Sequence, residues 1–353
     1  MPIEVLDRAR LVVVTGKGGT GKTTVAAAVA VAAAQRGRRT LLAEVEGRQG
    51  LAGLFDRRPL GYRETRLTDG VNGLAVDPEA ALREYLGRYG FAPLARLLSW
   101  AKLTSFITAA APGLGDVLLV GKVWEAATRR KGQRLTYDLV VLDAPPTGRV
   151  VPFLRAPETV AELARFGLLR HQADRVKDLL DDPERTGVLL TCLPEELPVT
   201  ETLEAAVALR AAELPLAAVV VGQVTDDRLG SRAARLSGLA QDPSPLAAAA
   251  KRADVELSDE ALAALVAEGR DRQRQITRER RLLKELRAGI GDLPVVELPL
   301  LSGGAASLEA IRVLAGRLAA SRLAGATAPA EGKGARRAAP QGRAAPTNLD
   351  ARP

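Results

Sequence analysis

The sequence predicts an α/β protein in which helices cover both faces of a doubly wound, mostly parallel β-sheet. Three observations support this fold class. Short apolar runs such as Leu11–Val14 and Tyr137–Asp143 have the length and composition of buried strands. Helical segments alternate with such runs along the chain, and this alternation is typical of parallel sheets. A glycine-rich turn separates the first run from the alanine-rich segment Val25–Ala34, so a strand there connects tightly to a helix.

The other elements follow from the same patterns. Strands are expected at Leu11–Val14, Arg39–Glu46, Gly73–Pro78, Tyr137–Asp143, Thr186–Glu196, Leu216–Val221 and Leu293–Leu298. Helices are expected at Val25–Ala34, at 79–131 with several glycine and proline breaks, and at Glu158–Leu180, Val199–Glu213, Asp259–Arg287 and Leu308–Leu318. Ser258 is expected to cap the longest of these helices, because Asp259 and Glu260 occupy the first turn after it.

Composition indicates an ordinary globular protein with an aliphatic core. Of the 353 residues, 47% are hydrophobic and 26% charged, and only 3% are aromatic. The single cysteine, Cys192, excludes an intrachain disulfide framework and favours a reducing, cytoplasmic location. Residues 1–10 lack the apolar length of a secretory signal. The longest uncharged apolar run, Val25–Ala34, is well short of the ~20 residues that span a membrane.

The turn after the first strand carries the main functional signal. Residues 16–24 read GKGGTGKTT, which fits the P-loop spacing G-x-x-x-x-G-K-T between a strand and a helix. Backbone N–H groups wrap a phosphate chain in such a loop, and glycines permit the close approach. Lys22 is expected to reach the β- and γ-phosphates, and the Thr23 hydroxyl to bind Mg²⁺. The predicted phosphate-binding residues are Gly16, Lys17, Gly18, Gly19, Thr20, Gly21, Lys22, Thr23 and Thr24.

A second acidic signal completes the expected magnesium site. The apolar strand Tyr137–Asp143 ends in an acid, which is the Walker B pattern, and Asp143 is expected to hold Mg²⁺ opposite Thr23. The fold is therefore predicted to be of the P-loop NTPase type, with ATP and Mg²⁺ as the bound groups. The N/T-K-x-D signature of guanine-binding proteins is absent from the sequence, which favours ATP over GTP.

Lys17 is a second lysine inside the loop, and it makes the motif a deviant Walker A sequence. In this feature the chain resembles the deviant P-loop ATPases, and in particular the arsenite-pump and tail-anchored-protein-targeting ATPases. The resemblance implies that Lys17 reaches the nucleotide of a facing subunit, in a homodimer or in a heterodimer with a paralogue. Lys17 and Lys22 are then both expected to act in catalysis. The alternative for Lys17 is an ordinary solvated loop lysine.

The segment after the second strand is similar to the switch I segment of that family, although it is degenerate. Counting back from Phe55 aligns Glu46 with the family's aspartate that positions the attacking water, and Gln49 with its histidine. Glu46 is therefore the predicted catalytic carboxylate, and its extra methylene leaves the hydrolysis rate open. Glu44 is a weaker competitor for this role, and a carboxylate that merely ends a strand is the alternative for Glu46.

Three later segments extend the resemblance over about residues 10–320. Ala144–Arg149 is similar to switch II, a loop that changes course when the γ-phosphate is lost. Gln223 lies near the family's asparagine that bonds adenine, and it keeps an amide donor and acceptor. Pro299 and Leu300 resemble the family's loop that lines the base.

The expected domain organisation has three parts. Residues 1–321 form one P-loop ATPase domain, and about 79–131 form a helical subdomain inserted into it. The remaining residues, 322–353, are rich in Ala, Gly, Pro and Arg and are expected to be a disordered tail. This tail contains six basic and two acidic residues, so it carries a net charge of +4, half of the total of +8. That distribution argues against a nucleic-acid-binding domain, and leaves a solvated terminus or a weak contact with anionic lipid or nucleic acid.

The sequence limits the cargo without identifying it. One cysteine per chain cannot supply a three-thiolate arsenite site even in a dimer, and the family's C-x-x-C zinc motif is missing, so neither site is expected. The expected function is a dimeric Mg-ATP-dependent ATPase that switches a helical surface for a protein client. The alternatives are a nucleotide-gated binding module with weak hydrolysis, and a positioning ATPase that acts on membrane or DNA through the tail.

Overall fold

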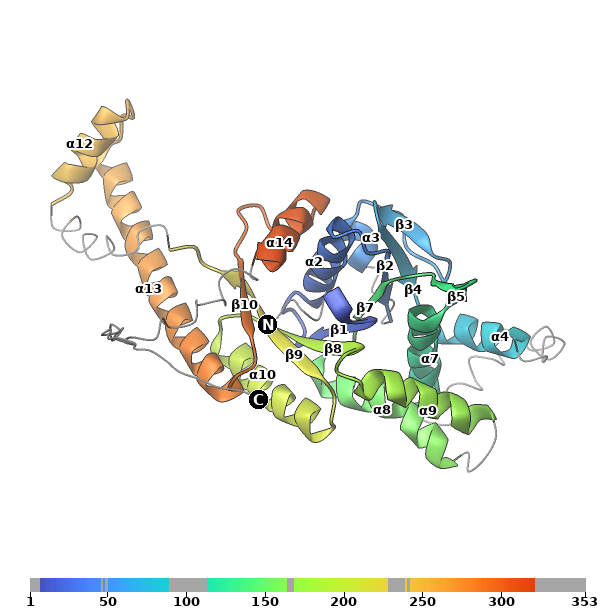
Figure 1. Cartoon of the computed structure of the whole chain (residues 1–353). Coiled ribbons are helices and arrows are strands. Elements are labelled where there is room, and N and C mark those ends of the chain that lie inside the picture. The colour runs from blue at the N-terminus through green and yellow to red at the C-terminus, as the bar shows by residue number, and fades with distance from the viewer. Residues whose placement is uncertain are drawn as a thin grey trace, which may run out of the picture.

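The computed structural model describes residues 7–45, 47, 50–88, 113–163, 168–227, 239 and 242–320. Within them lies one eight-stranded sheet with the order β10-β9-β8-β1-β7-β2-β4-β3, together with a small two-stranded hairpin, β5-β6 (Figure 1). Neighbouring strands of the large sheet run parallel, except that β3 pairs antiparallel with β4 at one edge. This arrangement confirms the predicted doubly wound, mostly parallel fold.

The bounds of the elements are as follows. The strands are β1 (Leu11–Gly16), β2 (Thr40–Glu44), β3 (Thr65–Thr68), β4 (Val71–Ala75), β5 (Arg130–Lys131), β6 (Arg134–Leu135), β7 (Leu139–Asp143), β8 (Thr186–Cys192), β9 (Leu216–Val224) and β10 (Val295–Pro299). The described helices are α2 (Lys22–Gln35), α3 (Gly50–Leu54), α4 (Pro78–Arg88), α7 (Leu114–Thr128), α8 (Thr147–Leu163), α9 (Leu168–Asp181), α10 (Glu196–Ala211), α12 (Ser244–Arg252), α13 (Asp259–Ile290) and α14 (Leu308–Ala320).

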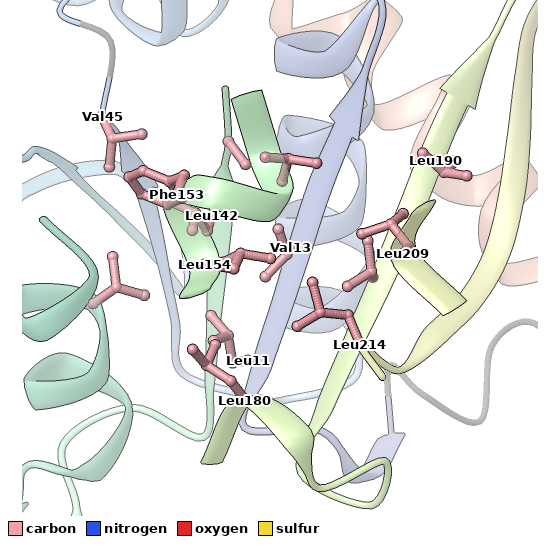
Figure 2. Packing of buried hydrophobic residues seen from close by; sticks show 14 of the residues in the cluster. Leu11, Val13, Val45, Leu142, Phe153, Leu154, Leu180, Leu190, Leu209 and Leu214 are labelled. Atoms are coloured by element: carbon pink, nitrogen blue, oxygen red, sulfur yellow. The ribbon is translucent and has the colours of Figure 1, made fainter. Parts of the chain in front are cut away.

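The sheet separates two apolar cores, and the alternation of side chains along β1 shows how. Leu11 and Val13 face the core shared with α7, α8, α9 and α10, where Phe153 is fully buried (Figure 2). Val12 and Val14 face the other core, which α2 and α14 cover. The two cores fix the carboxyl end of β1, where the glycine-rich turn begins.

Helix α2 is buried almost all round, which explains its composition. Its buried residues are Lys22 and the run Val25–Ala33, and most of this run is alanine. Small side chains let the helix lie close to the sheet and to α14, so its amino end is held firmly above β1. No helix among the described residues is long and apolar enough to cross a membrane.

Several elements differ from the expectation. The helix predicted at Glu158–Leu180 is two helices, and the first begins much earlier, at Thr147, and contains Pro152 and Pro157. Prolines in a sequence argue against a helix interior, so the helical start was not predicted. The short elements α3, β3, β5, β6 and α12 were also not predicted. The inserted region is described only as α4 and α7, because residues 89–112 lie outside the described part.

The long C-terminal helix largely agrees with the prediction. The Ser258 side chain accepts a hydrogen bond from the backbone N–H of Ala261 at 3.2 Å, as expected of a capping residue. The helix continues past the predicted end to Ile290 and stops at Gly291, whose φ of 72° favours glycine. In Figure 1, α13 extends away from the sheet with α12 beside its far end. The predicted basic tail, 322–353, lies outside the described residues.

Candidate nucleotide-binding site

The glycine-rich turn has the conformation that its sequence predicts. Gly19 and Gly21 have φ values of 89° and 84°, in the left-handed region that glycine adopts without strain. Gly21 is the residue directly before α2, so the backbone of the loop leads directly into the amino end of a buried helix. A helix amino terminus carries unpaired N–H groups and a partial positive charge, which together bind phosphate groups.

The loop is held closed by bonds to one carbonyl. The Lys17 carbonyl oxygen accepts hydrogen bonds from Thr20 Oγ1 at 2.8 Å and from Lys22 Nζ at 3.3 Å. The Thr20 hydroxyl also contacts the Thr191 hydroxyl on β8, at 2.7 Å. Lys22 is only 6% exposed, so its ammonium group is kept inside the loop rather than in solvent. This lysine is therefore placed where a phosphate chain would enter.

Thr23 and Asp143 meet as the sequence predicts. The Thr23 hydroxyl, in the first turn of α2, donates a hydrogen bond to Asp143 Oδ2 at 2.7 Å. The two residues are close because β1, which leads into the P-loop and α2, pairs with β7 so that Val14 lies opposite Asp143. A hydroxyl and a carboxylate are hard oxygen ligands of the kind that Mg²⁺ prefers. The residues present therefore fit a magnesium ion, which Thr23 and Asp143 would hold beside the phosphates.

A cavity of about 270 Å³ lies over this pair. Its described lining is Gly19, Gly21, Lys22, Thr23, Thr24, Glu44, Gly50, Asp143 and Ala144. Glu44, which the sequence analysis treats as a weaker competitor for the catalytic role, also lines this cavity. Its carboxylate is buried, 4% exposed, and Oε2 accepts a long hydrogen bond of 3.4 Å from the backbone N–H of Leu51. Glu46 and Gln49, the predicted switch I residues, lie outside the described residues.

Lys17 contacts a residue that the sequence analysis missed. Its Nζ lies 2.6 Å from Oε1 of Glu201, on α10 of the same chain. Both side chains are about one-third exposed, 32% and 31%. The lysine that the resemblance assigns to a facing subunit is thus paired within its own chain. No local signal identified Glu201, because it is 184 positions away in sequence.

The residues predicted to bind the base come together at the ends of two adjacent strands. Gln223 lies near the end of β9, is exposed and has a positive φ of 57°. Pro299 ends β10 opposite Val224, and the Leu300 N–H donates to the Val224 carbonyl at 2.9 Å. Strand β9 is separated from β1 by β8 alone, so this group and the P-loop share the carboxyl edge of the sheet. Ligands of open α/β sheets bind at this edge.

The segment after Asp143 connects the site to the helices. The Thr15 hydroxyl donates to the Pro145 carbonyl at 2.6 Å, which joins the end of β1 to the predicted switch II. Helix α8 then begins at Thr147, and Arg149 in its first turn pairs with Asp116 in the first turn of α7 at 3.0 Å. The segment after Asp143 is therefore linked to α7 through the Arg149–Asp116 pair.

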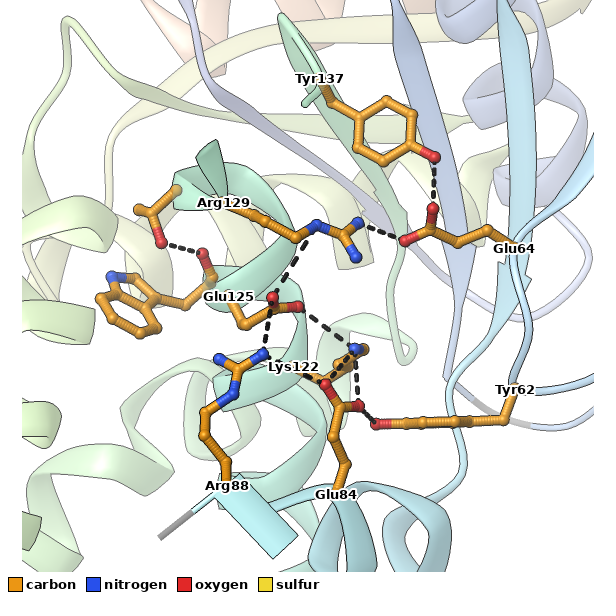
Figure 3. Close-up of polar contacts among 10 residues, drawn as sticks. Tyr62, Glu64, Glu84, Arg88, Lys122, Glu125, Arg129 and Tyr137 are labelled. Carbon is orange, nitrogen blue, oxygen red and sulfur yellow. Dashed lines mark hydrogen bonds and ion pairs between the residues drawn. The ribbon is translucent and has the colours of Figure 1, made fainter. Parts of the chain in front are cut away.

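Helices α4 and α7 are joined by a polar network (Figure 3). Glu84 on α4 accepts hydrogen bonds from Lys122 on α7 at 2.7 Å and from the Tyr62 hydroxyl at 2.5 Å. Burial alone would raise the pKa of Glu84, but these two hydrogen bonds prevail and lower it. Burial and the bond to Glu84 raise the pKa of Tyr62 far above its ordinary value. The carboxylate thus stays charged and the phenol stays a donor, so the contact persists at neutral pH.

The same network reaches the sheet (Figure 3). Arg129, just after α7, pairs with Glu64, which also accepts a hydrogen bond from the Tyr137 hydroxyl at 2.6 Å. Burial and the bond to Glu64 raise the pKa of Tyr137 to about 12. Tyr137 in turn accepts from Asn72 on β4 at 2.8 Å. Helix α7 is therefore tied to both α4 and the sheet by hydrogen bonds and ion pairs.

The parallel sheet, the P-loop at the end of β1 and the Thr23–Asp143 pair define a P-loop nucleotide-binding protein. The anion-transporting ATPase family matches residues 9–170 and 168–238. The chain is 40% identical over 307 residues to ATPase BagA of Mycobacterium tuberculosis, which covers 85% of this chain and 89% of that protein. This chain belongs to the anion-transporting ATPase family and is an ATPase by class. The resemblance that the motifs indicate is thereby confirmed.

More distant relatives agree with this assignment. ATPase GET3 of Lachancea thermotolerans is 25% identical over 252 residues, which is 60% of this chain and 71% of that one. ATPase ARSA1 of Chlamydomonas reinhardtii is 25% identical over 287 residues, which is 64% of this chain and 37% of that one. Both matches are weaker than the one to BagA and cover less of this chain.

Proposed function

We propose that this chain binds ATP with Mg²⁺ at the P-loop, closes as a dimer across the nucleotide, and uses hydrolysis to switch a helical surface for a protein partner. The observation that carries the proposal is the Thr23–Asp143 pair at 2.7 Å beneath a P-loop whose lysine is buried. Magnesium, when bound, would neutralise charge on the phosphates and orient them.

The chain's own groups have distinct tasks in this proposal. The backbone N–H groups of residues 18–24 bind the phosphate oxygens, and Lys22 exchanges the Lys17 carbonyl for the β- and γ-phosphates. Lys17 leaves Glu201 and reaches the nucleotide of the facing copy or of a paralogue. Glu46 positions the attacking water, and Gln223, Pro299 and Leu300 contact the adenine base. Phosphoryl transfer depends mainly on such positioning and on charge.

The switch is proposed to run from the nucleotide to α7 through the segment after Asp143. Loss of the γ-phosphate would change the path of residues 144–149, and the Arg149–Asp116 pair would pass this change to α7. Because α4 and α7 share the Glu84–Lys122 contact, they would move together.

The proposed client surface is supported by a mainly apolar cavity between α4, α7 and α9. The cavity has a volume of about 240 Å³, and its lining includes Leu82, Leu118, Trp124 and Val176. An apolar groove between helices is suited to an apolar helical segment of a protein. We further propose a cytoplasmic location, because Cys192 is a free and buried thiol.

ATP turnover by the purified protein tests the central part of this proposal. We expect Lys22→Ala to lower turnover by at least about a hundredfold, because a charge that stabilises the transition state is removed. The matched control is Lys284→Ala, on an exposed position of α13, which should leave turnover unchanged. Equal turnover in the Lys22→Ala protein would reject the P-loop as the hydrolytic site.

A second candidate is a nucleotide-gated binding module that hydrolyses slowly. The observation that favours it is the glutamate at Glu46, where the family pattern has an aspartate. Single-turnover hydrolysis separates the two candidates. An ATPase should lose the chemical step in Glu46→Gln, whereas a slow binding module should show nearly the same low rate in both proteins.

A further inference from the structure

Two carboxylates face the phosphate cavity from neighbouring strands, Glu44, which is buried, and Asp143, which is half-buried. Strands β2 and β7 are parallel neighbours, and their register sets Glu44 directly beside Asp143 at the carboxyl ends. Neighbouring strands lie about 4.8 Å apart, and residues in register point to the same face of the sheet. Both side chains line the cavity together with Thr23. The site therefore holds one more carboxylate than the Walker B pattern requires.

A bound nucleotide would change the balance of positive and negative charge around this cavity. In the described lining the charged side chains are Lys22, Glu44 and Asp143. Lys22 is the group that the phosphates would draw toward themselves. Two adjacent carboxylates beside a triphosphate would repel it and each other. A divalent cation placed between the carboxylates and the phosphates removes this repulsion.

Glu44 also contacts the segment that follows β2. Its Oε2 accepts from the Leu51 N–H, in the first turn of α3. The start of α3 also lies against Thr23, because a Cβ added at Gly50 would come within 3.2 Å of Thr23 Cγ2. The first turn of α3 thus touches both Glu44 and Thr23, so a change at the magnesium position would alter its contacts.

We propose that Glu44 is a second carboxylate of the magnesium position, which lies beside Asp143 and ties the bound ion to α3. This inference rests on the proposed nucleotide function and adds a positioning residue to it. The competing explanation is that Glu44 serves only the fold, by accepting the Leu51 N–H. The two explanations differ in one observable, the dependence of nucleotide binding on magnesium.

The test measures the affinity of a fluorescent ADP analogue over a range of Mg²⁺ concentrations and in EDTA. Glu44→Gln keeps an oxygen that accepts from Leu51 and removes the charge. We expect the Mg²⁺ midpoint to rise by about ten- to a hundredfold, as for other groups that support a bound metal. Affinity in EDTA should stay the same or improve, because one negative charge is gone. Asp143→Asn should raise the midpoint in the same direction.

Glu204→Gln is the matched control, because Glu204 is an exposed glutamate on α10. It should keep the wild-type midpoint. If Glu44→Gln melts at a lower temperature but keeps the wild-type Mg²⁺ midpoint, Glu44 serves the fold alone and the inference is overturned. If Glu44→Gln does not fold, Glu44→Asp is tested instead, because aspartate places the carboxylate one methylene further from the ion. A raised Mg²⁺ midpoint in Glu44→Asp supports the inference, and an unchanged midpoint overturns it. Failure of the wild-type protein to bind nucleotide would instead reject the proposed function.

Discussion

The contact between Lys17 and Glu201 leads to a quantitative prediction about dimer formation. If Lys17 must reach the nucleotide of a second chain, it has to leave Glu201, from which its Nζ is 2.6 Å away. Each chain of a symmetric dimer breaks one such pair on closing. Glu201→Gln removes the charge that holds Lys17, so it should strengthen ATP-dependent dimerisation.

The size of the effect follows from the exposure of the pair. Both side chains are about one-third exposed, so solvent screens the interaction and the pair stabilises the open chain by about 0.5–1 kcal/mol. Breaking two pairs per dimer therefore costs about 1–2 kcal/mol. Removing this cost should lower the dimer dissociation constant by roughly five- to thirtyfold.

Sedimentation velocity with Mg²⁺ and a slowly hydrolysed ATP analogue measures this constant. Glu204→Gln, three residues further along α10, changes the same kind of side chain on an exposed position and should leave the constant unchanged. Introducing Lys17→Ala should abolish the effect of Glu201→Gln, because the two residues act as a pair. An equal or weaker dimer in Glu201→Gln would refute the idea that this pair competes with closure.

Two further predictions concern the stability of the fold. Gly16→Ala should lower the free energy of unfolding by about 2 kcal/mol or more, because the new Cβ would come within 2.5 Å of the Thr191 carbonyl oxygen. Gly18→Ala is the control, because the space around Gly18 is open and the substitution should change the free energy of unfolding little. Denaturant titration measures both variants, and equal unfolding midpoints would contradict this explanation. The hydrogen bond from Arg39 lowers the pKa of Asp138 to about 2, so the stability that this pair supplies is present above about pH 4 and disappears as the pH falls toward 2. Asp138→Asn should therefore be less stable than the wild type by about 0.5–1 kcal/mol at pH 7, with the difference vanishing near pH 2; a difference that does not change with pH would contradict this.

The fold and the heart of the site were predictable because their signals are local. The P-loop motif and the acid at the end of Tyr137–Asp143 each lie within ten residues, and the strand pattern alone brought Asp143 to the edge where Thr23 lies. The start of α8 was not predictable, since Pro152 and Pro157 lie inside it. Both prolines lie beyond the first turn, so each removes one backbone hydrogen bond, and the burial of Val150, Phe153 and Leu154 in the core offsets that loss.

Contacts between distant strands could not be deduced from the sequence. The Thr20–Thr191 and Lys17–Glu201 contacts depend on β8 lying beside β1, and the sequence does not give strand order. The role of Glu44 depends on register, because a shift of one residue along β2 would turn its side chain to the other face.

The central claim is that Lys17 acts on the nucleotide of a neighbouring copy, and mixing two inactive variants tests it most directly. Lys17→Ala and Lys22→Ala should each lack ATPase activity alone. In a mixed dimer, one site would combine an intact Lys22 with an intact Lys17 from the other chain. An equal mixture should therefore recover about a quarter of the wild-type turnover, because half of the randomly formed dimers are mixed and each has one working site. If the mixture stays as inactive as its components while mixed dimers are shown to form, Lys17 does not act across the dimer.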